Sequence, residues 1–274
     1  MALYVNTNVA SLNAQRNLNN STSSLSTSLQ RLSSGLRVNS AKDDAAGMAI
    51  ATGMTSAIRG SQVAMRNAND AISMAQTAEG VLDQVESNTQ RMRELAVQGA
   101  NASVTSSNRA QIKLELDALG KENKRLLSGA TFNGTSLFKN NASQNFVFQV
   151  GSGTSANDRI TLNIKAAAFS AATRTNAFST QANARSVMSD LDNSLKALST
   201  MRASLGAAQN RFSAVVTSLQ TYSENMSASK SRIMDTDFAT ETANMTRNQI
   251  IQQAGTAMLA QANQLPSAAM SLLR

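Results

Sequence analysis

Apolar residues recur every three or four positions along two long stretches of the chain. In the first stretch the apolar positions are Met54, Ile58, Met65, Ala68, Ile72, Ala75, Leu82, Val85, Met92 and Leu95. In the second they are Leu191, Leu195, Leu198, Leu205, Ala208, Phe212, Val215, Leu219, Tyr222 and Met226. A heptad seam sustained over this many turns is typical of coiled-coil helices. We therefore predict two long helical rods, the first ~80 Å long at 1.5 Å per residue, packed antiparallel against each other.

The segment between the two rods carries a shorter helix and a change of period. Ile112, Leu116, Leu119 and Leu126 repeat the helical spacing, and Gly129 is the expected end of that helix. Further on, Phe146, Phe148 and Val150 alternate with Val147 and Gln149, and after a stretch with two glycines Ile160, Leu162 and Ile164 alternate with Thr161 and Asn163. This pattern predicts a β-hairpin over about residues 146–164. Residues 166–186 are mostly Ala, Ser, Thr and Asn, and we expect a loop there that leads into the second rod.

Each end of the chain has a narrower apolar stripe. The N-terminal stripe consists of Leu18, Leu25, Leu29, Leu32 and Leu36, and the C-terminal one of Ile251, Ala254, Met258, Ala262 and Leu265. Stripes this narrow do not build a core of their own, so we expect them to pack on each other and on the same stripes of neighbouring copies. Between the first stripe and the first rod, Ser40 and Asp43 fit an S-x-x-D capping box that would begin the long helix.

The sequence thus predicts a mainly α fold: long antiparallel rods of coiled-coil type, one β-hairpin, and paired N- and C-terminal helices. Composition narrows what such a fold can do. The chain has no His and no Cys, which removes the commonest general base, the thiol nucleophile and the usual zinc ligands. We expect no enzyme, no metal and no cofactor.

The formal net charge of +8 raises the question of an acidic partner. The basic residues are scattered and aromatic residues make up only 4% of the chain, so we expect neither nucleic acid nor membrane as a partner. Residues 1–15 hold no Lys or Arg and no apolar run, so we expect no cleaved signal peptide of the general secretory type.

Long stretches at both ends resemble bacterial flagellins. They are VNTNVASLNAQRNL at 5–18, LQRLSSGLRVNSAKDDAAGMAIA at 29–51, RNANDAISMAQTAEG at 66–80 and SRIMDTDFATETANMTRNQIIQQAGTAMLAQANQLPSAAMSLLR at 231–274. The resemblance implies a subunit that polymerises into the extracellular filament of the flagellum. It also implies export by the flagellar type III route, with an export chaperone, a cap and hook-junction proteins as partners.

In flagellins the terminal helices form an inner tube, and the long helices form a shell around it. Carried over, this gives an inner-tube part of residues 1–42 and 232–274 and a shell part of residues 43–231. Large flagellins insert whole outer domains in the middle, where this chain has only a short loop. The resemblance therefore implies a short form of the family.

Two surface roles are also implied by the resemblance. The motif QRMRELAVQ at 90–98 is similar to the part of many flagellins that a host innate-immune receptor recognises, and the matching residues are Arg91, Leu95 and Glu115. Many flagellins carry O-linked sugars on outer loops. The candidate acceptors here are Ser106, Ser107, Thr154, Ser155, Thr173 and Thr175.

Two other interpretations remain open at this point. A secreted adhesin or needle-tip protein would use the same coiled-coil plan but form soluble oligomers rather than fibres. A protein lying on a membrane surface would need an aromatic-rich apolar face bordered by many basic residues, whereas the N-terminal stripe is accompanied only by Arg16, Arg31 and Arg37.

Overall fold

The structure is a computed structural model that describes residues 7–139, 143–165 and 178–271, with side chains as far as residue 264. Its helices are α1 (Val9–Ser34), α2 (Ala45–Gly99), α3 (Ser106–Gly129), α4 (Gln181–Met234) and α5 (Phe238–Ser271). The chain divides into two compact units, a terminal unit of residues 1–56 with 225–274 and a central unit of residues 57–224.

Antiparallel packing of α2 on α4 organises the central unit. Successive clusters join Ala68 to Phe212, then Leu82 to Leu205, then Met92 to Leu191. Because residue numbers rise along α2 while they fall along α4, the two helices run in opposite directions, as predicted from the heptads. The shorter α3 adds Leu116 and Leu127 to the same core.

Two antiparallel hairpins complete the central unit. Strands β3 (Ser143–Gln149) and β4 (Arg159–Lys165) pair with Phe146 opposite Leu162. Val147 is exposed while Ile160, Leu162 and Ile164 are buried, which confirms the predicted hairpin and its inward face. The Phe148 ring meets the Phe212 ring of α4 edge-on at 5.6 Å between centroids.

The second hairpin was not predicted. Strands β1 (Thr131–Phe132) and β2 (Thr135–Ser136) are joined by Asn133 and Gly134, both with positive φ. Asn-Gly is the dipeptide that tight two-residue hairpin turns favour.

The start of α4 corrects the expected loop of residues 166–186. Residues 181–186 are helical, and the Thr180 hydroxyl accepts a hydrogen bond from the Asn183 backbone N–H at 3.2 Å. Phe178 is buried against Gly99 at the end of α2. Residues 166–177 lie outside the described residues.

The beginning of α2 corrects the predicted capping box. Asp43 accepts hydrogen bonds from the Ser40 backbone and hydroxyl at 2.9 and 3.0 Å, and these bonds hold the pKa of Asp43 below its ordinary value. The helix itself begins at Ala45, and it is Asp44 whose carboxylate accepts from the Gly47 N–H, at 2.9 Å. Ser40 and Asp43 therefore close the turn before the helix, and Asp44 caps it.

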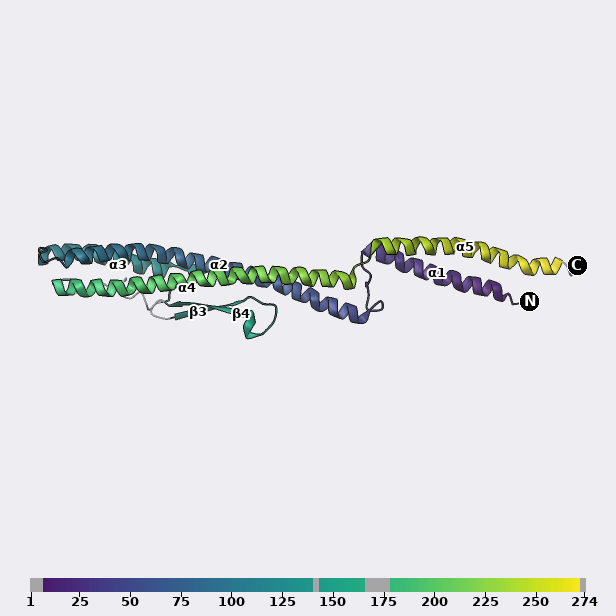
Figure 1. The fold of residues 1–274 in the computed structure, drawn as a ribbon, viewed down its shortest axis with the longest axis horizontal. Helices are drawn as coiled ribbons and strands as arrows, with labels where there is room; N and C mark the ends of the chain where they lie inside the picture. Colours follow the sequence, from purple (N-terminus) through teal and green to yellow (C-terminus); the bar gives the residue numbers. More distant parts are fainter. Residues whose placement is uncertain (1–6, 140–142, 166–177, 272–274) are drawn as a thin grey trace. The chain divides into compact units, whose positions relative to one another are not determined.

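In the terminal unit, α1 and α5 lie side by side in opposite directions (Figure 1). Asn8 donates to the Ala262 carbonyl at 2.7 Å, and Ser21 donates to the Asn248 carbonyl at 3.1 Å. The ends of the described chain therefore lie together, as predicted.

Candidate functional site

The seam between α1 and α5 is only partly apolar. Along α1 the buried or half-buried positions that follow the heptad spacing are Ser11, Ala14, Leu18, Ser21, Leu25, Ser28 and Leu32. Along α5 they are Glu241, Met245, Asn248, Gln252, Gly255, Leu259 and Ala262. Polar residues and glycine thus take about half of the positions that a stable coiled coil fills with large aliphatic side chains.

Small side chains let the two helices approach closely. A Cβ atom on Gly255 would lie 3.3 Å from Cδ1 of Leu18, so this leucine packs where the glycine leaves room. The most buried positions of α1 are Ser21 and Ser28, which are 7% and 4% exposed. The pair is therefore narrow and buries little apolar surface, which limits its stability as an isolated unit.

An ion pair lies at the other end of the seam. A guanidinium nitrogen of Arg31 is 3.8 Å from Glu241 Oε2, and the Glu241 side chain is only 10% exposed. Among the described residues no group accepts a hydrogen bond from the buried Arg31 Nε. An ion pair this deeply placed adds little net stability but penalises other alignments of the helices, because a shift would bury each charge alone.

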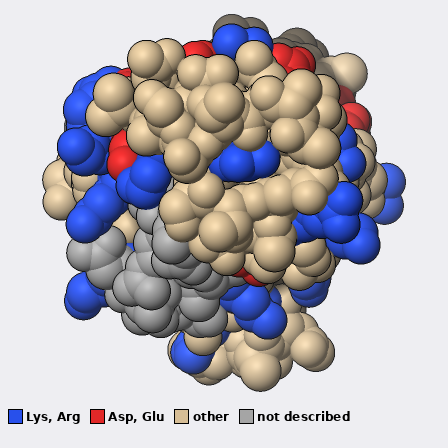
Figure 2. Space-filling model, turned by 90° about the vertical axis from the view of Figure 1, so that its left-hand side faces the viewer, with Lys and Arg blue, Asp and Glu red and all other residues tan. Residues whose placement is uncertain are grey.

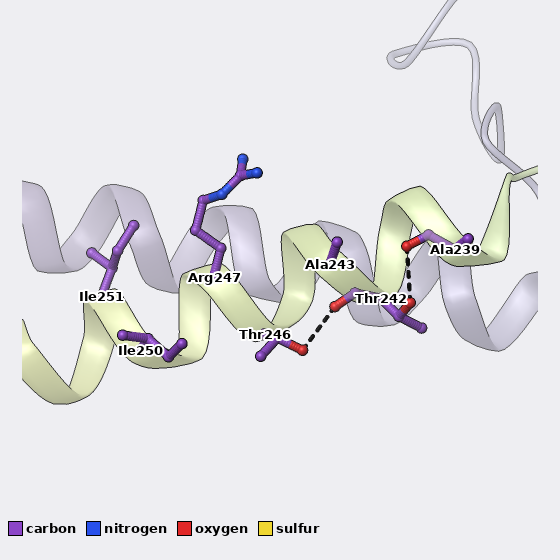
Figure 3. Close-up of a pocket in the computed structure, with 7 residues that line it drawn as sticks. All are labelled: Ala239, Thr242, Ala243, Thr246, Arg247, Ile250 and Ile251. Atoms are coloured by element: carbon purple, nitrogen blue, oxygen red, sulfur yellow. Dashed lines mark hydrogen bonds between the residues drawn. The ribbon is translucent and has the colours of Figure 1, made fainter.

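The outward side of α5 is apolar and open. A groove of about 510 Å³ is lined by Ala239, Thr242, Ala243, Thr246, Arg247, Ile250 and Ile251 (Figure 3). Their spacing of three and four places them on one face of the helix, and all are exposed. The Thr246 hydroxyl donates to the Thr242 carbonyl at 2.9 Å, so the groove residues include hydroxyl groups already satisfied by the helix.

These contacts correct part of the predicted stripe pairing. Leu18, Leu25 and Leu32 are half-buried along the seam, and Ala262 is buried beside Asn8, near the start of α1. Ile251, Ala254 and Met258 are exposed instead, so the prediction that they pack on α1 of the same chain is wrong. The sequence did not determine which side of α5 faces α1, because this helix carries apolar residues on more than one side.

Two of the predicted residues fall outside the helix seam. Leu29 is exposed, and Leu36 is half-buried in the connection after α1. The side chain of Leu265 lies outside the described residues.

The connections on either side of this helix pair are tied together. Gly35 ends α1 with φ of 71°, a left-handed conformation that glycine adopts without strain. Its carbonyl accepts from the Thr236 N–H at 2.9 Å, and the Arg37 N–H donates to the Met234 carbonyl at 2.6 Å. Asp237 then caps α5, and hydrogen bonds from Thr240, first of all from its hydroxyl, lower the pKa of Asp237.

The receptor-motif residues lie in the central unit, on α2 and α3. Arg91 donates to Glu94 at 3.0 Å and to Glu115 at 3.0 Å, and these bonds, first of all the one to Glu94, raise the pKa of Arg91. Both Arg91 and Glu115 are exposed. Leu95 is only 3% exposed and belongs to the core formed with Met92 and Leu191.

Some other charged residues of the central unit form ion pairs as well. Arg202 bridges Asp83 and Glu86, and Arg93 pairs with Asp192. On the face seen in Figure 2, lysines and arginines gather in groups at the margins, with uncharged surface between the groups and some carboxylates beside them. Across a surface with such pairing, individual ion pairs contribute little to stability.

The Ser and Thr candidates occupy exposed places where the structure describes them. Ser106 and Ser107 begin α3, and Thr154 and Ser155 lie in the turn before β4. The Ser155 hydroxyl already accepts from the Asn157 N–H at 3.4 Å. Thr173 and Thr175 lie outside the described residues.

Two structural residues escaped the sequence analysis. Arg109 is buried and donates from Nε to the Gly99 carbonyl at 2.8 Å, which satisfies the end of α2. Asn123 is buried beside Asn88, whose amide donates to its Oδ1 at 2.8 Å. Asn123 falls seven residues after Leu116, so heptad continuity was an available signal, whereas no local pattern marks Arg109.

Both halves of the chain match models of a known protein family. The model of the bacterial flagellin N-terminal helical region matches residues 5–143, and that of the C-terminal helical region matches residues 188–273. A flagellin of Halalkalibacterium halodurans is 40% identical over 275 residues, covering 99% of this chain and all of that protein.

Longer relatives match as well. Flagellin B of Vibrio anguillarum is 35% identical over 376 aligned residues, covering all of both chains. The crystal structure of Bacillus cereus flagellin aligns with a TM-score of 0.49 at 25% identity, over 60% of this chain and 94% of that one. No helix in the described part of the chain is long and apolar enough to cross a membrane.

A terminal helix pair that buries little apolar surface and turns aliphatic residues outward is typical of subunits that complete their burial against copies of themselves. The family matches agree with this interpretation of the chain as a self-assembling subunit. The chain belongs to the bacterial flagellins, as a short form of the family. It is a structural subunit that self-assembles into the extracellular helical filament of the bacterial flagellum, which serves swimming motility.

Proposed function

We propose that the outward side of α5, together with the leucines of α1, forms the contact between neighbouring flagellins in the filament. One observation carries this proposal: Ile250 and Met258 are 60% and 64% exposed, although polar residues and glycine take about half of the seam positions of the same helix. Of the two terminal stripes, the exposed members Leu29, Ile251, Ala254 and Met258 would make this contact, together with Ile250 and the groove beside it.

The free energy of burying apolar side chains favours a contact between subunits at these exposed aliphatic residues. Burying one leucine-sized side chain contributes roughly 1.5–3 kcal/mol, and each 1.4 kcal/mol changes an equilibrium constant about tenfold. Every subunit repeats the contact, so exposed aliphatic residues that cost the monomer solubility stabilise the polymer. In this proposal, residues 1–42 and 232–274 form the inner part of the filament, and residues 43–231 form the shell.

The test introduces a charge into the groove. Ile250→Asp places a carboxylate in an apolar contact and should abolish sedimentable filaments, because an unpaired charge is costly to bury. Gln249→Asp adds the same charge one residue away, outside the groove, and is the matched control. If Ile250→Asp assembles at the same protein concentration as Gln249→Asp, the outward side of α5 is not a subunit contact.

We extend the proposal to the export partners. The narrow seam suits a terminal pair that separates easily, as passage through the type III route without a cleaved signal peptide requires. An export chaperone would then hold the C-terminal segment, and the cap and hook-junction proteins would meet subunits already in the filament. Removing residues 240–274 should abolish co-purification with the chaperone, whereas removing residues 1–36 should not.

We further propose that the surface around Arg91 and Glu115 is recognised by the innate-immune receptor. Their exposure supports a contact role, whereas the burial of Leu95 assigns that residue to the core in the monomer. Arg91→Ala should weaken receptor activation by monomer in a reporter assay. Arg125→Ala is the matched control, because Arg125 is an exposed, ion-paired arginine on α3. Equal responses would refute the assignment.

O-linked sugars on the exposed loops complete the proposal. The exposure of Ser106, Ser107, Thr154 and Ser155 supports these acceptors, with Thr173 and Thr175 as further candidates. Intact-mass measurement of native filament protein should exceed the sequence mass, and peptide mapping should place the added mass on these residues. A measured mass equal to that of the sequence excludes the modification.

A further inference from the structure

Two fully buried polar side chains interrupt the apolar spacing where α2 and α3 meet. On α2 the residues at this spacing are Leu82, Val85, Thr89, Met92 and Ala96, and on α3 they are Ile112, Leu116, Leu119, Asn123 and Leu126. Thr89 and Asn123 are the polar members of the two series, and both are 0% exposed. Because a polar side chain in a helix seam costs stability, these two residues call for a role other than holding the helices together.

Thr89 and Asn123 face each other within a hydrogen-bond network. Asn123 donates from Nδ2 to Thr89 Oγ1 at 3.4 Å, and its Oδ1 accepts from the Asn88 amide at 2.8 Å. Gln84 donates to Asn88 Oδ1 at 3.1 Å, and the Thr89 hydroxyl donates to the Val85 carbonyl at 2.6 Å. One side chain of α3 is thus tied to several groups of α2.

The apolar spacing does not fix how far along α2 the helix α3 lies. If α3 slid by one turn, its leucines would again meet apolar residues, but Asn123 would face Val85 or Met92 and lose its bonds with Asn88 and Thr89. The side chain of Val85 forms no hydrogen bonds and that of Met92 accepts only weakly, so the slid arrangement is penalised. The connecting residues 100–105 reach up to ~20 Å when extended and do not prevent such a slide by themselves.

The position of α3 along α2 decides whether Glu115 meets Arg91. Glu115 lies about two turns before Asn123, and its carboxylate is 3.0 Å from the Arg91 guanidinium. A slide of one turn moves Glu115 by ~5 Å along the axis, beyond ion-pair distance. This exposed pair is too weak to hold the helix itself. At the near end of α3, Arg109 donates to carbonyls at the end of α2 and just after it, which leaves the far part of α3 to Asn123.

We propose that Asn123 is a positioning residue, whose bonds with Asn88 and Thr89 hold α3 at the one place along α2 where Glu115 and Arg91 form a single surface. As far as it concerns receptor recognition, this inference rests on the proposed role of Arg91 and Glu115. The network favours one alignment at a cost in stability, as a single buried polar residue does when it fixes the register of a coiled coil.

Spin labels measure the alignment directly, because the chain contains no Cys and two introduced cysteines carry the only labels. Ser73→Cys on α2 and Lys121→Cys on α3 replace exposed residues about 25–30 Å apart along the axis, so a slide of α3 changes the distance between the labels almost one for one. Pulsed electron paramagnetic resonance of the full-length monomer should give one narrow distance distribution. Asn123→Leu should broaden this distribution or shift it by ~5 Å, while the urea midpoint stays the same or rises.

Two further variants separate alignment from packing. Leu127→Ala shortens a buried leucine of the same helix and should lower the urea midpoint without changing the distance distribution. Asn88→Ala removes only the donor to Asn123 Oδ1 and should broaden the distribution less than Asn123→Leu does. In the receptor assay, Asn123→Leu should reduce activation as much as Arg91→Ala, although residue 123 is buried and cannot touch a receptor.

The possible results distinguish the two claims. The inference is overturned if Asn123→Leu leaves the distance distribution unchanged, or if Leu127→Ala broadens it equally. Should Asn123→Leu fail to fold, an unchanged distribution for Asn88→Ala overturns the inference instead. If Arg91→Ala does not weaken receptor activation, the proposed receptor surface falls, and the label distances alone decide the role of Asn123. If Arg91→Ala weakens activation and Asn123→Leu does not, the receptor surface stands and the positioning role is overturned.

Discussion

The two antiparallel helix pairs of this flagellin use the same spacing with different residues. In the α2–α4 seam, Leu82, Leu198 and Leu205 are fully buried. In the α1–α5 seam the most buried positions of α1 are serines, and among the described residues no large side chain of either helix is fully buried. A heptad alone therefore indicates a helix pair, and the residues that fill it indicate whether the pair holds itself together or is completed by other subunits.

Removing the terminal pair is the most severe way to test this difference. We expect a chain without residues 1–36 and 240–274 to form no filaments while its central unit stays helical and unfolds cooperatively, because the clusters of the central unit lie within residues 57–224. Sedimentation and far-UV circular dichroism measure the two properties. A truncated chain without helicity would show that the terminal pair supports the central fold.

Truncating one side chain in each seam compares them directly. Phe212→Ala removes a fully buried ring of the central unit and should lower the free energy of unfolding by about 3–5 kcal/mol. Leu18→Ala removes a half-buried leucine of the terminal seam and should scarcely move the main unfolding transition. Urea denaturation of both variants checks the contrast, which disappears if the two midpoints shift equally.

The ion pair tests whether the terminal seam depends on register. Arg31→Met leaves Glu241 buried without its cation and should cost up to about 3 kcal/mol, less than a fully buried pair because Arg31 is one-third exposed. The loss should appear as a raised critical concentration for assembly. Arg31→Met combined with Glu241→Met removes both charges and should recover most of the loss. If the double variant has a critical concentration as high as that of Arg31→Met alone, the Arg31–Glu241 ion pair does not set the alignment of the two helices.

The smallest expected effect comes from acid. The pKa of Asp237 in the folded chain lies below its ordinary value of 3.8, chiefly because the Thr240 hydroxyl donates to it. Because this pKa is lowered, the ionised cap contributes its full stabilisation of α5 above about pH 3.8. That stabilisation is lost as the pH falls through the pKa of Asp237 in the folded chain. Acid titration of monomer helicity should therefore show a small loss at the low-pH end. Asp237→Asn, which cannot lose a charge, should reduce that loss.

Periodicity in the sequence predicted the elements that bury their own apolar residues. The heptads of α2 and α4 and the alternation in β3 and β4 have one apolar face each, and one face has only one way to be buried. The Asn133-Gly134 turn was equally readable but was missed. The caps of α2 were harder to predict, because Ser40, Asp43 and Asp44 all favour a helix start and only the backbone path selects Asp44.

Tertiary structure alone decided which side of α5 meets α1. Its sequence offers apolar residues on several sides, so no pattern distinguishes the side with Leu259 and Ala262 from the side with Ile250 and Met258. The choice depends on the fit of Leu18 against Gly255 and on the Arg31–Glu241 pair, which joins residues more than 200 positions apart. Contacts between distant segments depend on the shapes and charges of both segments. The spacing of apolar residues along one helix indicates only that the helix packs against some partner.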